Sequence, residues 1–340
     1  MILKTVNVST GPVGITAEVQ SALAAPCISH RSAGFERLYI RTTELLCKEM
    51  NVQQTFLLTG SGTVANEAML WQIKMKGGKG LILSNGEFGT RLIEQSRRNL
   101  LNFLVYKLEW GKKFDVSEVE KLVQHNELKW LLFCHCETST GVINDLNTLS
   151  EIVTKNNCLC FVDCMSTVGT YPINLSKVAM ATASSGKGFA SVPGLAIVFS
   201  NIPVQTGDYI PICLDLHHYL QKKGIPFTIS SKLVSALYTS IQQKLQNNQF
   251  ELLHEYGERF YNRLSNQNLV PYSDPQSKVF TIVHRNNARK DFIDKMNYKQ
   301  VSFSYESEYL VKSNWCQLAT FGYYTKHDLD YVLQALGRRK

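Results

Sequence analysis

The chain has 340 residues, of which 44% are hydrophobic and 19% charged, with 21 glycines and nine prolines. These proportions exclude disordered, collagen-like and low-complexity proteins. The net charge is +8, from 36 basic and 28 acidic residues. The basic residues are scattered in short clusters, the last at 338–340. We therefore expect no nucleic-acid partner, since proteins that bind nucleic acids concentrate positive charge in a stripe.

We expect neither a membrane span nor a signal peptide. No run of about 18 apolar residues predicts a membrane span, and the first eight residues lack the apolar core of a signal peptide. Nine cysteines occur without a CxxC pair. Cys134 and Cys136, like Cys158 and Cys160, alternate within apolar stretches, which predicts pairs of reduced thiols on one face of a strand. We expect a cytoplasmic protein with no metal site.

Short apolar stretches alternate with helical ones. The expected strands are 55–59, 80–84, 130–136, 158–163 and 194–200, and the expected helices are 64–76, 90–99, 147–155 and 233–245, with helical character continuing to about 264. Near-continuous apolar strands separated by helices predict a mostly parallel sheet covered on both faces.

The composition changes after about residue 250. Strands are expected at 279–283 and 301–305, and a closing helix at 327–336. We predict an α/β protein with a large domain over residues 1–249 and a small α+β domain over residues 250–340. The first 20 residues are expected to pack on the small domain.

Unusual residues occur at four strand ends, where an open α/β sheet binds its ligands. Residues 60–63, Gly-Ser-Gly-Thr, open a helix whose free N–H groups suit a phosphate, although a tight turn would read the same way. Polar residues crowd positions 135–141. Asp163 ends a buried strand, where an acid needs a charged partner or caps the next helix.

Lys187 is the only charged residue between 178 and 206, which favours a desolvated, nucleophilic amine over a surface lysine. Pyridoxal phosphate requires this combination of groups: a helix N-terminus for its phosphate, an acid for its ring nitrogen and a lysine for its aldehyde.

These residues make the chain resemble the class V aminotransferases of the fold-type I pyridoxal phosphate superfamily. The matching stretches are 9–12, 29–31, 60–63, 85–91 and 137–141. Asp163-Cys-Met-Ser-Thr-Val-Gly169, and Lys187 followed by Val-Pro-Gly at 192–194, resemble 2-aminoethylphosphonate–pyruvate aminotransferases more than alanine–glyoxylate aminotransferases.

The resemblance implies pyridoxal 5′-phosphate as cofactor and assigns roles to matching residues. Lys187 would hold the cofactor covalently and transfer a proton, and Asp163 would pair with the ring nitrogen. Phe88 would stack on the ring, and Thr138 would lie near its hydroxyl. The implied phosphate ligands are Ser61, Gly62, Thr63 and Ser185, with Thr228 reaching the phosphate of the neighbouring subunit in a homodimer.

The substrate site departs from the family pattern. Gln317 stands where members typically carry an arginine that grips the substrate's acidic group. We expect Gly11, Arg31 and Gln317 to bind substrate, with Arg31 or Arg285 as replacements for the missing charge.

The expected function is transfer of an amino group from a small amine or amino acid, such as 2-aminoethylphosphonate or alanine, to a 2-oxo acid such as pyruvate or glyoxylate. A pyridoxal phosphate-dependent lyase or decarboxylase, and a non-catalytic binding protein that keeps the fold, remain the alternatives.

Overall fold

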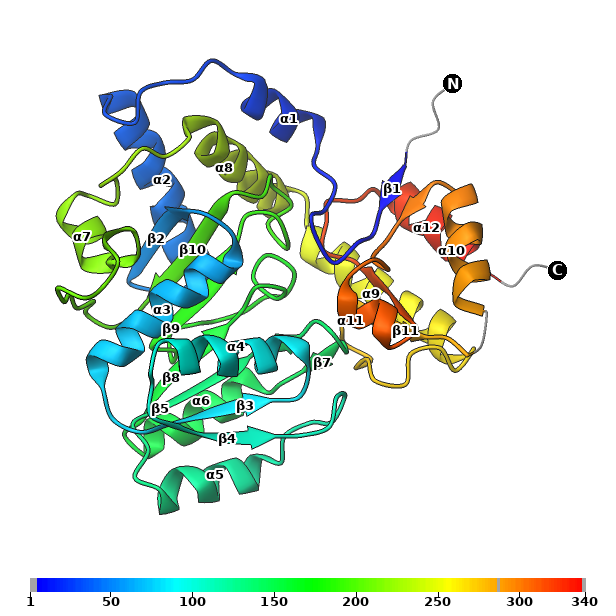
Figure 1. Ribbon diagram of the computed structural model, residues 1–340. Helices are drawn as coiled ribbons and strands as arrows, with labels where there is room; N and C mark the ends of the chain where they lie inside the picture. Colours follow the sequence, from blue (N-terminus) through cyan, green and yellow to red (C-terminus); the bar gives the residue numbers. More distant parts are fainter. Residues whose placement is uncertain (1–4, 286–287, 338–340) are drawn as a thin grey trace.

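The computed structural model describes residues 5–285 and 288–337 (Figure 1). Its central sheet joins seven strands of the described chain in the spatial order β2-β10-β9-β8-β5-β3-β4. Their bounds are β2 (Gln54–Thr59), β3 (Gly80–Ser84), β4 (Phe103–Lys107), β5 (Trp130–Cys134), β8 (Leu159–Asp163), β9 (Met180–Ser184) and β10 (Leu195–Ser200). β10 is antiparallel to β2 and β9, and the other neighbouring pairs are parallel, which confirms the predicted sheet.

Helices cover both faces of this sheet (Figure 1). One hydrophobic cluster takes in α2 (Ala33–Met50), α5 (Val116–His125), α6 (Leu146–Lys155) and α8 (Ser231–Gln246); a second takes in α3 (Gly62–Lys76), α4 (Glu87–Arg98) and α7 (Leu216–Gln221). Leu81 and Leu83 belong to the first cluster and Ile82 to the second. Successive side chains of a strand are thus buried on opposite faces, which explains the continuous apolar runs.

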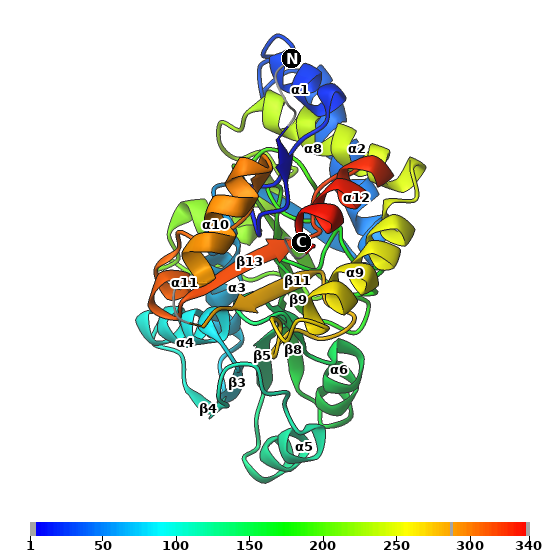
Figure 2. The same ribbon diagram turned by 90° about the vertical axis from the view of Figure 1, so that its right-hand side faces the viewer.

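The C-terminal part, which faces the viewer in Figure 2, has a hydrophobic core of its own. It contains α9 (Gln249–Ser265), β11 (Val279–Val283), α10 (Ala288–Tyr298), β12 (Val301–Ser302), α11 (Glu308–Lys312), β13 (Trp315–Ala319) and α12 (Lys326–Ala335). β11 and β13 pair antiparallel. The N-terminal strand β1 (Val6–Asn7) pairs with β12, so Val6 and Val8 join this core, whereas α1 (Ala17–Ala24) packs on α8. We propose domain limits of 1–249 and 250–340, with β1 packed on the small domain and α1 packed on the large one.

Several element boundaries differ from expectation. Residues 130–136 form two strands, β5 and β6 (Cys136–Glu137), the latter pairing with β7 (Val142–Ile143), so Cys134 and Cys136 do not share one strand. The strand predicted over 301–305 stops at Ser302, and Ser304 forms an isolated bridge to Gln317. The long C-terminal helix breaks at Asn248, which has a left-handed backbone (φ 45°). β9 was not expected, since its sequence Met-Ala-Thr-Ala-Ser is not an apolar run.

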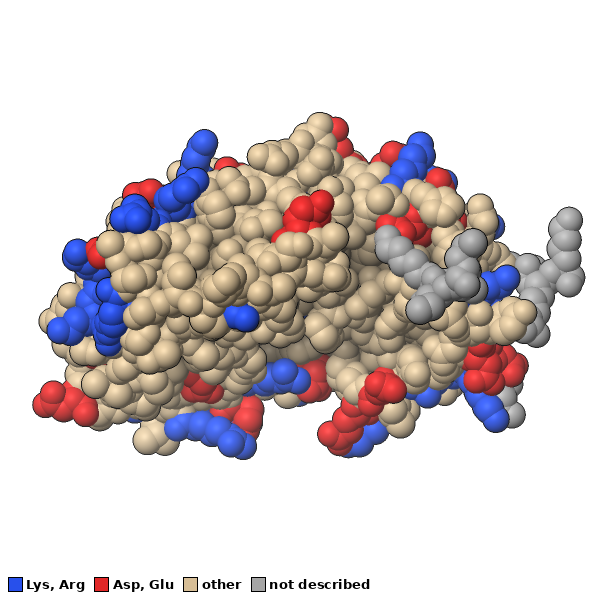
Figure 3. Space-filling model, turned by 90° about the horizontal axis from the view of Figure 1, so that it is seen from above, with Lys and Arg blue, Asp and Glu red and all other residues tan. Residues whose placement is uncertain are grey.

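All nine cysteines lie in the described chain and are unpaired. Across residues 5–285 and 288–337, no group of three or more His, Cys, Asp or Glu side chains gathers as metal ligands would. None of the helices in the described part combines the length and apolarity needed to cross a membrane. Acidic and basic side chains are interspersed on the face shown in Figure 3. The basic run at 338–340 lies outside the described residues.

A buried lysine links the two parts of the molecule. Lys244 on α8 is only 2% exposed, and its Nζ donates to the carbonyl oxygens of Gly169 (3.0 Å) and Phe321 (2.9 Å). Phe321 follows β13 of the small part, whereas Gly169 follows β8 of the sheet. Burial lowers the pKa of Lys244 to about 7, because an ammonium group loses hydration there.

Lys244 should make folding stability depend on pH. Between pH 7 and the ordinary lysine pKa of 10.5, the unfolded chain binds a proton at this residue that the folded chain does not. The free energy of unfolding should therefore rise with pH across that window. We expect Lys244→Met to flatten the rise in urea unfolding measured from pH 7 to 10, and Lys232→Met on the same helix to leave it unchanged. Parallel profiles for wild type and Lys244→Met would contradict this.

Candidate active site

The chemistry-bearing loops meet at one edge of the sheet. β2, β9, β8, β5 and β3 run in the same direction, so their carboxyl ends lie together. In Figure 1 the arrowhead of β3 points toward the small domain, which places this edge beside it. Because β10 runs the opposite way, the loop from β9 to β10, which carries Lys187, also lies at this edge.

Lys187 is half-buried, and its Nζ lies 5.3 Å from the ring centroid of Phe88. Burial lowers the pKa of Lys187, while the nearby Asp163 carboxylate opposes that shift. The N-terminal segment comes close as well: a Cβ on Gly11 would lie 3.2 Å from Lys187 Cγ. The structure thus brings three of the predicted site residues (Lys187, Asp163 and Phe88) together, with Gly11 beside them.

The Asp163 carboxylate is fixed by two donors. Its Oδ2 accepts from Asn66 Nδ2 at 2.8 Å, and its Oδ1 accepts from the Met165 N–H at 2.9 Å. Asn66 in turn accepts from Thr182 Oγ1 at 2.6 Å. These hydrogen bonds satisfy the Asp163 carboxylate, as a buried acid requires. Sequence reasoning missed Asn66, because it lies inside α3 and carries no local signal of its contact with β8.

The N-terminus of α3 is open. Ser61 is its N-cap but makes no side-chain capping bond, and Ser61 and Thr63 are exposed. Gly62 between them has no side chain to cover the backbone. Unsatisfied N–H groups at a helix N-terminus form a ready site for an anion.

Ser185 was expected to help Ser61, Gly62 and Thr63 to bind a phosphate, but its hydroxyl is engaged within its own loop. Its buried hydroxyl donates to the Val192 carbonyl at 2.6 Å and accepts from the Leu195 N–H at 3.2 Å. Both interactions close the loop that carries Lys187. The structure therefore gives Ser185 a role in fixing this loop, with its hydroxyl engaged there.

Phe88 is positioned by a buried acid. Glu137 is fully buried and accepts from the backbone N–H groups of Phe88 (3.2 Å) and Gly89 (2.9 Å), and from Ser139 Oγ (2.6 Å). Burial raises the pKa of Glu137, while these donors oppose the rise. Glu137 thus caps α4, which begins at Glu87, three residues earlier than predicted. The prediction missed this start because the capping residue is distant in the sequence. The adjacent Thr138 donates to Ser166 Oγ at 2.9 Å.

Gln317 is not free to bind substrate as the sequence led us to expect. Its Nε2 donates to the carbonyl oxygens of Thr138 (2.6 Å) and Ser139 (3.1 Å) and to Thr281 Oγ1 (2.8 Å). Its Oε1 accepts from the Tyr309 hydroxyl at 2.6 Å. The amide therefore ties β13 to the loop that follows β6, with its two N–H groups and its oxygen all in use.

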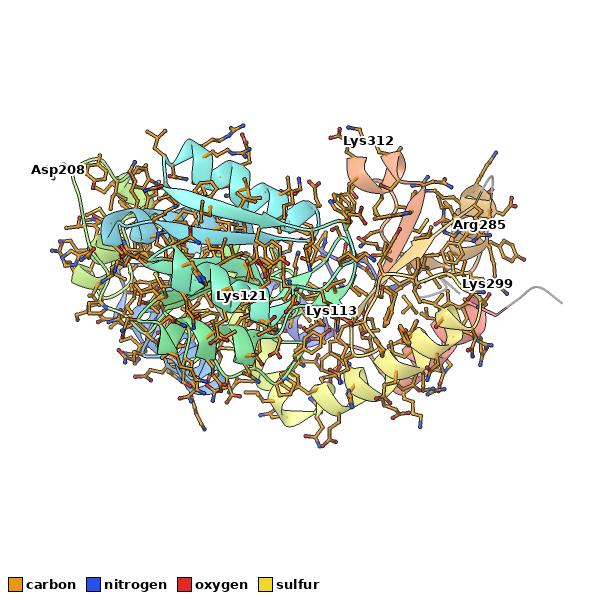
Figure 4. The ribbon with its side chains drawn as sticks, turned by 90° about the horizontal axis from the view of Figure 1, so that it is seen from below. Lys113, Lys121, Asp208, Arg285, Lys299 and Lys312 are labelled. Carbon is orange, nitrogen blue, oxygen red and sulfur yellow. The ribbon has the colours of Figure 1, made fainter. Side chains whose placement is uncertain are left out.

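The remaining predicted residues do not join the Lys187 group. Arg31 donates to the carbonyl oxygens of Ile225 and Pro226, both at 3.2 Å, and so holds the loop that precedes the exposed Thr228. Figure 4 places Arg285 on the outer part of the small domain, away from the central sheet. The structure therefore shows neither arginine beside Lys187.

The spacing of the Asp163 and Lys187 loops should depend on Gly188. A Cβ there would overlap the Val168 carbonyl oxygen and lie 2.9 Å from Thr170 Cγ2. We expect Gly188→Ala to lower the free energy of unfolding by about 1–3 kcal/mol through overpacking, and to weaken binding of pyridoxal phosphate in a titration. Gly34→Ala is the control, since its Cβ would meet only Ser32 Oγ at 3.9 Å. Equal behaviour of the two variants would contradict this.

Comparison with known proteins agrees with this geometry. Residues 19–204 match the family model described as aminotransferase class-V. An uncharacterized aminotransferase of Methanocaldococcus jannaschii is 30% identical over 249 residues, which cover 69% of this chain and 65% of that protein. The chain thus spans slightly less than two thirds of that relative's length.

Two further proteins are similar over larger shares of their length. The 2-aminoethylphosphonate–pyruvate transaminase of Pseudomonas putida is 27% identical, over 71% of each chain. The crystal structure of an alanine–glyoxylate aminotransferase from Nostoc sp. superposes with a TM-score of 0.87 at 21% identity, covering 99% of this chain and 95% of that one. The fold is that of the fold-type I enzymes, and the chain belongs to the class V aminotransferase family.

Proposed function

We propose that the chain is an aminotransferase that moves an amino group from a small amine or amino acid to a 2-oxo acid such as pyruvate or glyoxylate. The observation that carries this proposal is the half-buried Lys187 beside the ring of Phe88 and the fixed carboxylate of Asp163. The similarity to the Pseudomonas putida transaminase makes 2-aminoethylphosphonate the first donor to test, and alanine the second.

Membership of the family implies pyridoxal phosphate as the cofactor. When bound, this cofactor accepts the electron pair released at the donor's reacting carbon. The residues present fit it. The uncapped N-terminus of α3, with Ser61, Gly62 and Thr63, would hold the phosphate, and Asp163 would pair with the ring nitrogen.

The protein's own residues would do the proton transfer and the positioning. Because burial lowers its pKa, Lys187 can act as a neutral amine that takes up and returns a proton. Asn66 and the Met165 N–H keep the Asp163 carboxylate in one orientation. Phe88, held through its backbone by Glu137, would cover the ring of the cofactor, with Thr138 near its hydroxyl.

An absorbance titration tests this function. Purified protein mixed with pyridoxal phosphate should gain a visible band that bleaches with one amino donor and returns with pyruvate. Lys187→Ala should lose the covalently held cofactor and all turnover, because no other amine replaces it. Circular dichroism should show its fold to be intact. A wild-type protein that gains no band would refute the proposal.

Two outcomes would support the alternatives instead. Pyruvate formed from a single amino acid without an acceptor would indicate a lyase. A cofactor band that neither donors nor acceptors change, with no product, would indicate a binding protein.

We further propose that the functional unit is a homodimer in the cytoplasm. Exposed apolar side chains occur on and near α2 and α7, namely Ile28, Ile40, Ile212 and Leu220. Ile40 lines one groove with Lys223 and Gly224, close in sequence to Thr228. Such a patch suits a second copy of the chain. Nine unpaired thiols support a reducing compartment.

Light scattering should give a mass about twice the 38.4 kDa of one chain. Ile40→Asp should shift the protein toward the monomer, because it buries a charge in the proposed interface. Leu100→Asp, at another exposed apolar residue, should not. A wild-type mass equal to one chain would show the dimer proposal to be wrong.

A further inference from the structure

An acidic substrate needs a positive charge that Gln317 does not provide. Two arginines that could replace it are already engaged with backbone carbonyls. Arg31 binds Ile225 and Pro226. Arg289 donates to the carbonyl oxygens of Trp315 and Tyr305. These hydrogen bonds hold both guanidinium groups against backbone carbonyls, whereas a substrate at Lys187 needs a cation close to Phe88.

Arg91 is an arginine that the fold brings beside Phe88. It lies one turn after Phe88 on α4, and its guanidinium carbon is 4.9 Å from the centroid of that ring. Lys187 Nζ lies 5.3 Å from the same centroid. One aromatic ring thus contacts both the proposed catalytic amine and this guanidinium. The charge of Arg91 also contributes, after burial, to the lowered pKa of Lys187.

The partner of Arg91 holds it only loosely. Glu87 Oε1 lies 3.5 Å from Arg91 Nη2, and the two side chains are 32% and 47% exposed. An i,i+4 pair of this exposure contributes little to stability. A guanidinium has five N–H donors, and this one contact leaves most of them for a ligand. An incoming anion can therefore take the place of Glu87 at small cost.

The small domain contacts the ring of Phe88 through α11. Tyr309 on α11 packs edge-on against Phe88, with ring centroids 6.3 Å apart, and its hydroxyl donates to Gln317. Lys312, labelled in Figure 4, lies on the same short helix and pairs with Glu308 at 2.6 Å. Tyr309 thus contacts both the ring beside Arg91 and the uncharged Gln317.

We propose that Arg91 binds the acidic group of the substrate, a carboxylate or a phosphonate, and that Glu87 occupies Arg91 until that group arrives. The inference rests on the proposed aminotransferase function, whose substrates carry such groups. Arg91 is then a specificity-determining residue on α4 that supplies the charge missing at Gln317.

Calorimetry on the cofactor-loaded protein tests Arg91 directly. The probes are succinate, a dianion, and succinamide, its neutral counterpart. Arg91→Gln should weaken succinate binding roughly 10- to 100-fold, the loss expected for charge-assisted hydrogen bonds, without changing succinamide binding. Glu87→Gln should strengthen succinate binding, since it removes the competitor. Arg97→Gln, at an exposed arginine later on α4, should have no effect.

Steady-state kinetics give a second readout. Arg91→Gln should raise KM for pyruvate and for the donor, and Arg91→Lys should recover part of the loss. A larger effect on 2-aminoethylphosphonate than on alanine would assign the phosphonate to Arg91, and the reverse would assign the carboxylate.

The inference and the proposed function fail in different ways. If Arg91→Gln binds succinate as Arg97→Gln does, or if the wild type does not prefer succinate to succinamide, Arg91 is not the anion site. The visible cofactor band at Lys187 would be unaffected by that result. A wild-type protein that gains no visible band with pyridoxal phosphate would instead refute the proposed function.

Discussion

The close backbone approach of two loops sets the geometry of the site. Gly169, at the end of the loop after β8, packs against the backbone of Gly188, next to Lys187. A side chain on either glycine would force the loops apart, and with them Asp163 and Lys187. The buried Ser240 hydroxyl of α8 donates to the carbonyl oxygens of Phe189 and Ala190 and fixes the same loop from behind. The reactive amine therefore projects from a rigid support, as a preorganised site requires.

Fully satisfied polar groups then connect this support to the small domain. Gln317 on β13 links Tyr309 to the carbonyl of Thr138, and the neighbouring Glu137 holds the first turn of α4. In a buried network of this kind the loss of one member leaves its partners unpaired, at a cost larger than the bond itself. Movement of the small domain would consequently shift the ring of Phe88.

The sequence was informative wherever the signal was local. Apolar runs located most of the sheet, and the isolated Lys187 and the acid at Asp163 were placed at the correct edge because parallel strands end together. Prediction from the sequence failed where contacts between residues distant in the chain determine the structure. α4 starts early because Glu137, 49 residues after Phe88, caps it, and Asn66 on α3 reaches Asp163 at the end of β8. Gln317 was expected to bind substrate, but its hydrogen-bond partners on other elements could not be derived from the sequence spacing.

At Gln317, where the family resemblance leads us to expect an arginine, the amide has a structural role. An arginine there would need a buried anion, or a bound substrate, to offset its desolvation, whereas the amide is satisfied by Thr138, Ser139, Thr281 and Tyr309 whether or not substrate is present. The hydrogen bonds of this amide are therefore complete without a bound acid, and a charge that binds an acidic substrate would come from another residue, which we propose to be Arg91. Since Lys187 and Asp163 do not contact that position through any of these bonds, the family's chemistry can persist while the preferred substrate changes.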